Sequence, residues 1–308
     1  MQDAERNDVT QIGIDFGGTK IEAAVLNASG AFVTRRRVPT PGHYAEAIRA
    51  VADLIANVEA EVGTSGSIGI GLPGSISPRT GVMRNANTLY LNGSSFGRDL
   101  EKELGRPVRL ANDANCLALS EAKDGAGAGS RVVFAVIVGT GCGGGIVVDG
   151  KLIEGANGIT GEWGHIPLPW PRPDEYPGPD CWCGQKNCLE KWISGTGFRD
   201  DYERRAGERL KGDEIVTLAR GGDPLAKATL DDYIDRLGRG MAVIANILDP
   251  DCFVLGGGMS NVTELYDRLA PVIDRYTFSD GWEAKIAPAK WGDSSGVRGA
   301  AHLWPAEA

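Results

Sequence analysis

The chain has 308 residues, 42% of them hydrophobic, and a formal net charge of −9. This length and apolar content can fill the cores of about two α/β domains, which excludes a disordered chain. The acidic balance argues against binding to nucleic acid, because proteins that bind nucleic acid concentrate Lys and Arg to neutralise phosphates.

No apolar run in the sequence approaches the roughly 20 residues that a membrane-spanning helix needs. Residues 1–11 are polar and lack the apolar segment and small-residue cleavage site of a signal peptide. We therefore expect a cytoplasmic protein with no membrane partner.

The first half of the chain alternates apolar strands with turns and helices. Apolar residues at helical spacing predict a helix over residues 44–62, and an alanine-rich segment after residue 115 is also expected to be helical. The predicted strands of this half are residues 11–15, 21–26, 32–38, 67–72 and 108–110.

A similar pattern begins again at residue 132. Residues 132–138 form an apolar strand that breaks at the glycine-rich run 139–145 and resumes at 146–148 before an Asp-Gly hairpin turn. Because strand, glycine turn and strand occur twice, we predict two related α/β halves. Helices are expected at 190–206 and 224–248, a strand at 252–255, and a surface loop over the proline-rich residues 167–179.

Glycine turns follow the first strand of each half. Two G-x-G-x-x-G matches, starting at Gly69 and Gly139, lack the helix that a dinucleotide-binding loop requires, and the sequence contains no Walker A loop. The backbone N–H groups of glycine turns can cradle phosphates instead, so we predict that ATP binds between the turns. The predicted nucleotide-binding residues are Gly17, Gly18, Thr19, Lys20, Gly139, Thr140, Gly141, Gly143, Gly144, Gly257 and Gly258.

Asp15 ends the first strand beside the first of these turns. Its carboxylate could hold Mg²⁺ directly or through water. Taken alone, Asp15 could equally be a turn residue bonded to local backbone, and either turn could be a plain hairpin.

Asn112 and Asp113 follow the strand predicted at 108–110. Phosphoryl transfer to an alcohol needs a carboxylate that accepts the hydroxyl proton, and Asp113 is the best candidate for this base. Asn112 could hydrogen-bond a sugar. The pair could also cap the following helix, and the two roles can coexist.

His165, Cys181, Cys183 and Cys188 are four ligands of the types that structural Zn²⁺ prefers in a tetrahedral site. A disulfide is the rival interpretation, but the reducing conditions of the cytosol oppose it. Glu162 and Glu190 bracket this cluster and could accept hydrogen bonds from sugar hydroxyls. Glu190 could equally be a charge that favours the start of a helix.

These motifs together resemble the ROK family of sugar kinases and repressors, which has the two-lobed actin and hexokinase ATPase fold. The resemblance covers nearly the whole chain. It is carried by DFGGTK at 15–20, LANDAN at 110–115, GEWGH at 161–165 and the cysteine cluster through Glu190. Residues 74–78, 85–87 and 292–301 look like those of bacterial ROK fructokinases of the manno(fructo)kinase type.

The resemblance implies an α/β protein with a ribonuclease H-like core in each lobe and an ATP cleft between the lobes. Residues 1–122 and a C-terminal helix within 296–308 would form the first lobe, and residues 123–295 the second. Asp113 would be the base, with Asn112, Glu162, His165 and Glu190 around the sugar. Relatives also suggest Mg²⁺, a structural zinc and a homodimer. The gap between His165 and Cys181 is longer than in many relatives.

The leading functional hypothesis is phosphorylation of D-fructose to fructose 6-phosphate by ATP. A kinase for glucose, mannose or an N-acetylated hexosamine differs from this in pocket detail alone, so these substrates stay open. A sugar-sensing ROK repressor is a remote alternative, because about ten polar residues precede the first strand and a helix-turn-helix domain needs more.

Overall fold

The computed structural model describes residues 10–305. The first sheet has the strand order β3-β2-β1-β4-β7. Strands β1 to β3 pair antiparallel, whereas β4 lies parallel to β1 and β7 parallel to β4. The strands are β1 (Gln11–Phe16), β2 (Lys20–Leu26), β3 (Phe32–Pro39), β4 (Ser67–Leu72) and β7 (Val108–Asn112).

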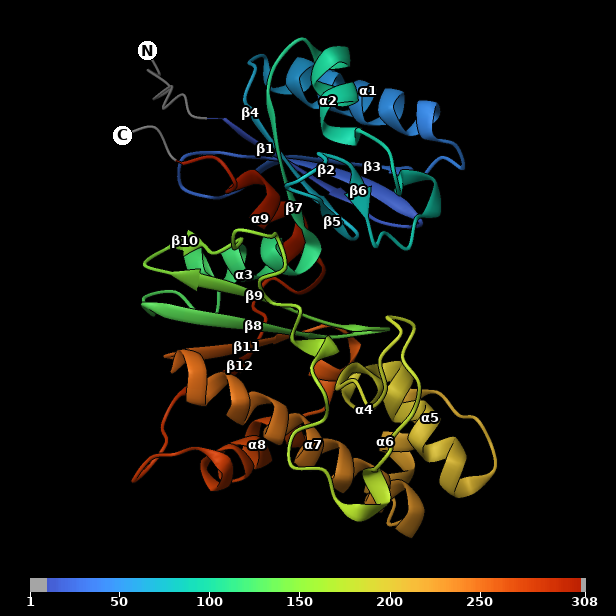
Figure 1. Ribbon diagram of the computed structural model, residues 1–308. Helices are drawn as coiled ribbons and strands as arrows, with labels where there is room; N and C mark the ends of the chain where they lie inside the picture. The colour runs from blue at the N-terminus through green and yellow to red at the C-terminus, as the bar shows by residue number, and fades with distance from the viewer. Residues whose placement is uncertain (1–9, 306–308) are drawn as a thin grey trace.

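The second sheet repeats this topology with the order β10-β9-β8-β11-β12. Its first three strands in sequence again pair antiparallel, and the last two add in parallel. The strands are β8 (Val132–Val138), β9 (Cys142–Val148), β10 (Lys151–Leu152), β11 (Cys252–Gly256) and β12 (Lys285–Pro288). Figure 1 shows one sheet above the other. The predicted two related halves are therefore confirmed.

Two helices, α3 (Asp113–Asp124) and α9 (Ser295–Ala301), lie between the sheets and pack on each other (Figure 1). α9 approaches β1 and β4 so closely that a Cβ atom at Gly13 would lie 1.9 Å from the Val297 carbonyl oxygen, and one at Gly69 would lie 1.8 Å from that of Ala300. The end of the chain thus returns to the first sheet. The helix is shorter than the expected 296–308, and residues 306–308 lie outside the described residues.

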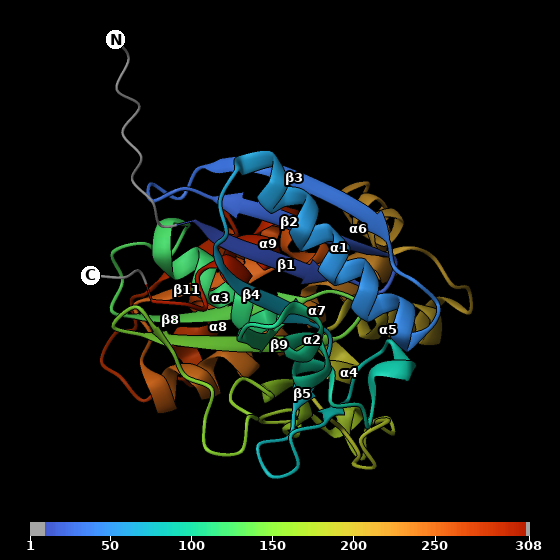
Figure 2. The same ribbon diagram turned by 90° about the horizontal axis from the view of Figure 1, so that it is seen from above.

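The remaining helices cover the outer faces of the two sheets. Figure 2 shows α1 across the first sheet, where α1 contacts β2 and β3. In the second sheet, Phe134 and Val136 pack toward α7, whereas Val133 and Ala135 pack toward α3, as strand alternation requires. The helices are α1 (Tyr44–Val62), α2 (Phe96–Leu104), α4 (Glu190–Ile193), α5 (Gly195–Ala206), α6 (Gly212–Arg220), α7 (Pro224–Leu248) and α8 (Glu264–Tyr276).

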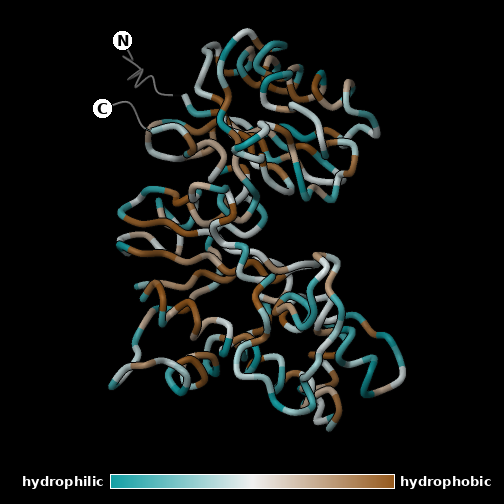
Figure 3. The backbone as a smooth tube through the Cα atoms, viewed as in Figure 1, coloured by the Kyte–Doolittle hydropathy of each residue, from teal (hydrophilic) through white to brown (hydrophobic). Residues whose placement is uncertain are grey.

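The hydrophobic residues gather on the strands and on the helix faces that meet them (Figure 3). Within residues 10–305, no helix combines the length and the apolar character needed to cross a bilayer. A small hairpin of β5 (Ser75–Ile76) and β6 (Met83–Arg84) extends from the first half.

Two predicted boundaries are wrong. β9 begins at Cys142, so the glycines at 143–145 lie inside the strand, where neighbouring atoms leave no room for larger side chains at 144 and 145. The helix predicted at 190–206 breaks at Ser194, because the Ser194 hydroxyl accepts a hydrogen bond from the Gly197 N–H at 2.9 Å and caps a new helix.

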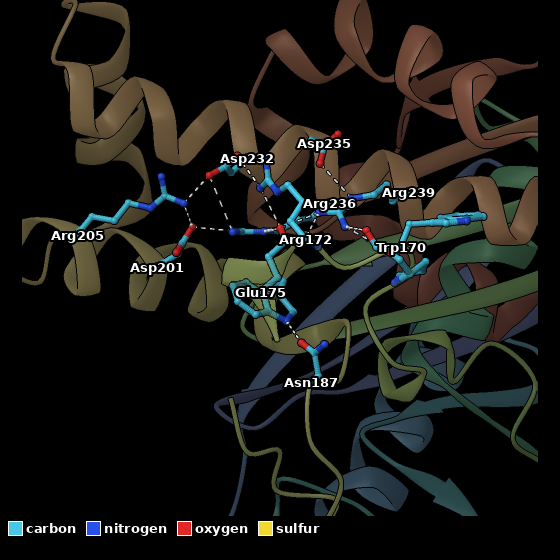
Figure 4. Close-up of polar contacts among 12 residues, drawn as sticks. Trp170, Arg172, Glu175, Asn187, Asp201, Arg205, Asp232, Asp235, Arg236 and Arg239 are labelled. Atoms are coloured by element: carbon cyan, nitrogen blue, oxygen red, sulfur yellow. Dashed lines mark hydrogen bonds and ion pairs between the residues drawn. The ribbon is translucent and has the colours of Figure 1, made fainter. Parts of the chain in front are cut away.

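The proline-rich loop (residues 167–179) is anchored to α7 by a buried ion-pair network (Figure 4). Glu175, 1% exposed, accepts hydrogen bonds from Arg236 at 2.7 Å and from Arg239 at 2.7 and 2.9 Å. Arg239 also donates to the backbone carbonyls of Pro169 and Trp170. The prediction of a surface loop is therefore incomplete, since the loop inserts one charged side chain into the interior.

Candidate active site

A cleft of about 2120 Å³ is lined by residues from both halves of the chain. It brings together much of the site predicted from the sequence. The predicted residues that line it are Asn112, Asp113, Gly139, Thr140, Gly141, Gly143, Gly144, Glu162, His165 and Glu190. The predicted residues outside this lining are Asp15, Gly17, Gly18, Thr19, Lys20, Gly257, Gly258, Cys181, Cys183 and Cys188.

Asp113 is the first residue of α3 and opens onto the cleft. The Asp113 carboxylate and the Asn112 amide oxygen both accept from the Ala114 N–H, at 2.8 and 2.7 Å. The Asn112 amide donates to the Gly74 carbonyl at 3.1 Å. Desolvation raises the pKa of Asp113, and the charge of Glu162 adds to the effect. Asp113 is exposed and lines the cleft, so a ligand in the cleft can reach it. The predicted helix cap is thus present, and a carboxyl group with a raised pKa suits a general base.

Asp15 lies at the end of β1, opposite Glu22 in the antiparallel pair. Desolvation by burial raises the pKa of Asp15 to about 6, and the charges of Asp113 and Glu22 contribute to this rise. α9 begins beside it, because a Cβ atom at Gly296 would lie 3.2 Å from the Asp15 carboxyl group. Glu22 is itself buried and paired with Arg35 and Arg37, so Asp15 is the carboxylate of this β1–β2 pair that is left for a cation.

The first glycine turn, between β1 and β2, is tight and open to solvent. The Gly17 N–H donates to the Lys20 carbonyl at 3.0 Å, and the Thr40 hydroxyl donates to the Gly17 carbonyl at 2.7 Å. Gly18, Thr19 and Lys20 are exposed. The predicted phosphate contacts of this turn stay a prediction.

The second glycine turn, between β8 and β9, lies next to Glu190, so a predicted nucleotide-binding segment contacts a predicted sugar-binding residue. The Gly195 N–H donates to the Gly139 carbonyl at 2.6 Å. The third turn packs behind it, since a Cβ atom at Gly257 would lie 2.9 Å from the Gly139 nitrogen. A Cβ atom at Gly141 would lie 2.9 Å from the Glu190 carboxylate. Glycine at this turn therefore lets Glu190 approach the backbone that we expect to hold phosphate.

Glu162 is positioned by the glycine that precedes it. Gly161 has a φ of +89°, and a Cβ atom there would lie 2.1 Å from the Gly144 carbonyl oxygen. Glycine is needed here both for the backbone angle and for the space. Trp163, which follows, is buried and donates from its indole to the Gly143 carbonyl at 2.9 Å. The segment is thereby fixed against β9.

The four predicted metal ligands come together. The ligand atoms of His165, Cys181, Cys183 and Cys188 all lie within 4.8 Å of one another. Cys183 Sγ and Cys188 Sγ are 3.5 Å apart, and Cys181 Sγ is 3.7 Å from His165 Nδ1. These separations are close to the edges of a tetrahedron with metal–ligand distances of about 2.0–2.3 Å. The cluster therefore fits a tetrahedral zinc ion, and the six cysteines of the chain are free of disulfides.

Some lining residues were not identified from the sequence. Trp182 lies in the cleft between two cysteines of the cluster, and Arg84 reaches across from β6 to the carbonyls of Asn157 and Gly158 at 2.8 and 3.3 Å. Thr196 also lines the cleft, at the start of α5. The Ser-Gly-Thr-Gly run at 194–197 is a capping signal that could have indicated Thr196, whereas the contact of Arg84 has no local signal.

The profile of the ROK family matches residues 11–307 of the chain. The N-acetyl-D-glucosamine kinase of Pectobacterium atrosepticum is 40% identical over 296 residues, which cover 94% of this chain and 97% of that protein. A ROK hexokinase structure from Thermus thermophilus superposes with a TM-score of 0.85 at 34% identity, covering 95% of this chain and 97% of the other.

A ROK glucokinase from Streptomyces griseus, solved with glucose and AMPPNP, superposes with a TM-score of 0.76 at 30% identity and covers 96% of this chain and 98% of that one. The family match and these similarities extend over nearly the full length of each protein. The chain therefore belongs to the ROK family and is a sugar kinase of that family.

Proposed function

We propose that the protein transfers the γ-phosphoryl group of ATP to the 6-hydroxyl of N-acetyl-D-glucosamine. The observation that carries this proposal is one shared cleft, which is lined by Asp113 together with Glu162, His165, Glu190 and the second glycine turn. The identity of the sugar is supported by the N-acetyl-D-glucosamine kinases that are 40% identical to this chain.

Asp113 accepts the proton of the sugar hydroxyl as the oxygen attacks phosphorus. Its raised pKa makes the carboxylate a stronger base than an ordinary aspartate in water. Asn112, Glu162, His165 and Glu190 orient the sugar hydroxyls so that the attacking oxygen faces the phosphate.

The glycine turns would hold the nucleotide phosphates through backbone N–H groups, and Asp15 would hold Mg²⁺. Mg²⁺, when bound with ATP, neutralises charge on the phosphate oxygens. His165, Cys181, Cys183 and Cys188 would hold a structural zinc, which fixes His165 and the segment leading to Glu190 on one wall of the cleft.

Fructose, the substrate favoured by the sequence motifs, stays a prediction, and glucose and mannose stay alternatives. An ADP-release assay with ATP and Mg²⁺ over N-acetyl-D-glucosamine, D-fructose, D-glucose and D-mannose separates them. We expect the highest kcat/KM for N-acetyl-D-glucosamine. A tenfold preference for another hexose would overturn the choice of sugar, and a lack of ADP release with every sugar would overturn the kinase proposal.

A further inference from the structure

Trp182 is the most exposed tryptophan among residues 10–305, with 67% of its surface accessible. It lies between Cys181, which is buried, and Cys183, and its side chain lines the cleft. A large aromatic side chain left open inside a cleft is a common feature of ligand-binding sites, because such sites combine aromatic surface with a few convergent polar groups.

The indole of Trp182 contacts two residues assigned to the sugar. Its Nε1–H donates to Glu190 Oε1 at 2.9 Å, and its ring meets the His165 ring edge-on with centroids 5.0 Å apart. The other oxygen of Glu190 accepts from the Cys142 N–H at 3.0 Å. The two donors hold the carboxylate in one orientation, and each oxygen keeps a lone pair that can accept from a hydroxyl group.

The other tryptophans of this part of the chain are either buried in the core or lie outside the cleft. Trp163 and Trp192 are each 4% exposed, and their indoles donate to the Gly143 carbonyl and to the Asn187 side chain. Trp170 is 47% exposed but stacks on Tyr276 and does not line the cleft. Trp182 differs from all three because its indole N–H donates to a cleft residue and two-thirds of its surface stays exposed beside the edge contact with His165.

We propose that Trp182 is a sugar-binding residue of this kinase. Its ring covers the apolar C–H face of the hexose, while its N–H fixes the Glu190 carboxylate that accepts from the sugar hydroxyls. This inference rests on the proposed function in that the ligand is a hexose, and it does not depend on which hexose is preferred.

The test compares Trp182→Phe and Trp182→Ala with Trp170→Phe, an exposed tryptophan outside the cleft. The substrate is whichever hexose the wild type phosphorylates. Trp182→Phe removes the N–H and should raise the KM for the sugar about tenfold, the size expected for losing a hydrogen bond to a charged group. Trp182→Ala should raise it further, while the KM for ATP stays within about twofold. Zinc content per chain is measured for each variant.

A second measurement does not require a Trp182 variant to fold. With excitation of tryptophan alone, Trp182 is the most exposed emitting residue among residues 10–305 of the Trp170→Phe protein, so acrylamide should quench Trp182 first. Binding of the hexose should cover the ring and reduce this quenching.

Quenching that is unchanged by saturating sugar would overturn the inference, as would a wild-type sugar KM in Trp182→Ala. A zinc-free Trp182→Phe protein whose sugar KM returns to the wild-type value after zinc is restored would also overturn it. If the wild type phosphorylates no hexose, the proposed function fails by itself, and the quenching result still decides whether Trp182 contacts sugar.

Discussion

Replacing Glu175 by glutamine should destabilise the protein without changing its cleft. Glu175 lies in the proline-rich loop, 1% exposed, and its carboxylate receives the guanidinium groups of Arg172, Arg236 and Arg239. Arg236 and Arg239 are themselves 2% and 0% exposed. Glutamine keeps the size of the side chain but leaves these cations without their shared counter-charge. Breaking a buried ion pair by removing one partner costs about 3–5 kcal/mol.

The pKa of Glu175 gives an independent magnitude. Burial by itself raises this pKa, but hydrogen bonds from Arg239, the Arg172 backbone and Arg236 outweigh it and lower the pKa to about 2. A fall from the ordinary 4.5 to about 2 corresponds to roughly 3 kcal/mol of stability. Because the folded pKa is depressed, this stability is present above about pH 4.5 and is lost as the pH falls toward 2.

The assay is unfolding by heat and by urea for the wild type, Glu175→Gln and the control Asp174→Asn, an exposed neighbour in the same loop. At pH 7 we expect Glu175→Gln to lower Tm by roughly 6–12 °C. The difference in unfolding free energy between the wild type and Glu175→Gln should narrow to about half of its pH 7 value by pH 3. A Tm that matches the Asp174→Asn control, or a gap that does not change with pH, would refute the reasoning.

Three further changes test the cleft. Asp113→Asn removes the proposed base and should lower kcat at least about 100-fold while sugar binding, measured by calorimetry, persists; wild-type turnover would remove Asp113 from the mechanism. Cys183→Ser should reduce zinc content and Tm together, and a wild-type protein that is fully stable without metal would contradict a structural zinc. Arg84→Ala removes the hydrogen bonds to Asn157 and Gly158 across the cleft and should raise the sugar KM about threefold to tenfold. The control is Arg79→Ala, an exposed neighbour of the same hairpin, and equal KM values for the two would count against a role for Arg84.

The order of strands and turns was readable from the sequence because the signals are local. Apolar runs and glycine turns at residues 11–18 and 132–141 repeat the same pattern, and the structure shows the same strand order in both sheets. The chemical types of Asp113 and of the His165 and cysteine cluster indicated the roles proposed for them, since a base and a tetrahedral metal site need particular side chains.

Local signals failed where a boundary depends on packing. The glycines at 143–145 suggest a turn, yet they form part of β9, because Ala118 and Phe134 pack closely against that strand. The helix expected at 190–206 is interrupted at Ser194 by a cap hydrogen bond that competes with helix continuation.

The sequence by itself determined the strand pattern, the type of fold and the residues able to do the chemistry, because these follow from periodicity and side-chain type. The tertiary structure decided that Glu175 is buried against two arginines of α7, that Arg84 reaches the opposite wall and that Trp182 is open beside Glu190. Burial and contact across the cleft depend on segments that lie far apart in the chain, and a local sequence pattern cannot predict how those segments pack together.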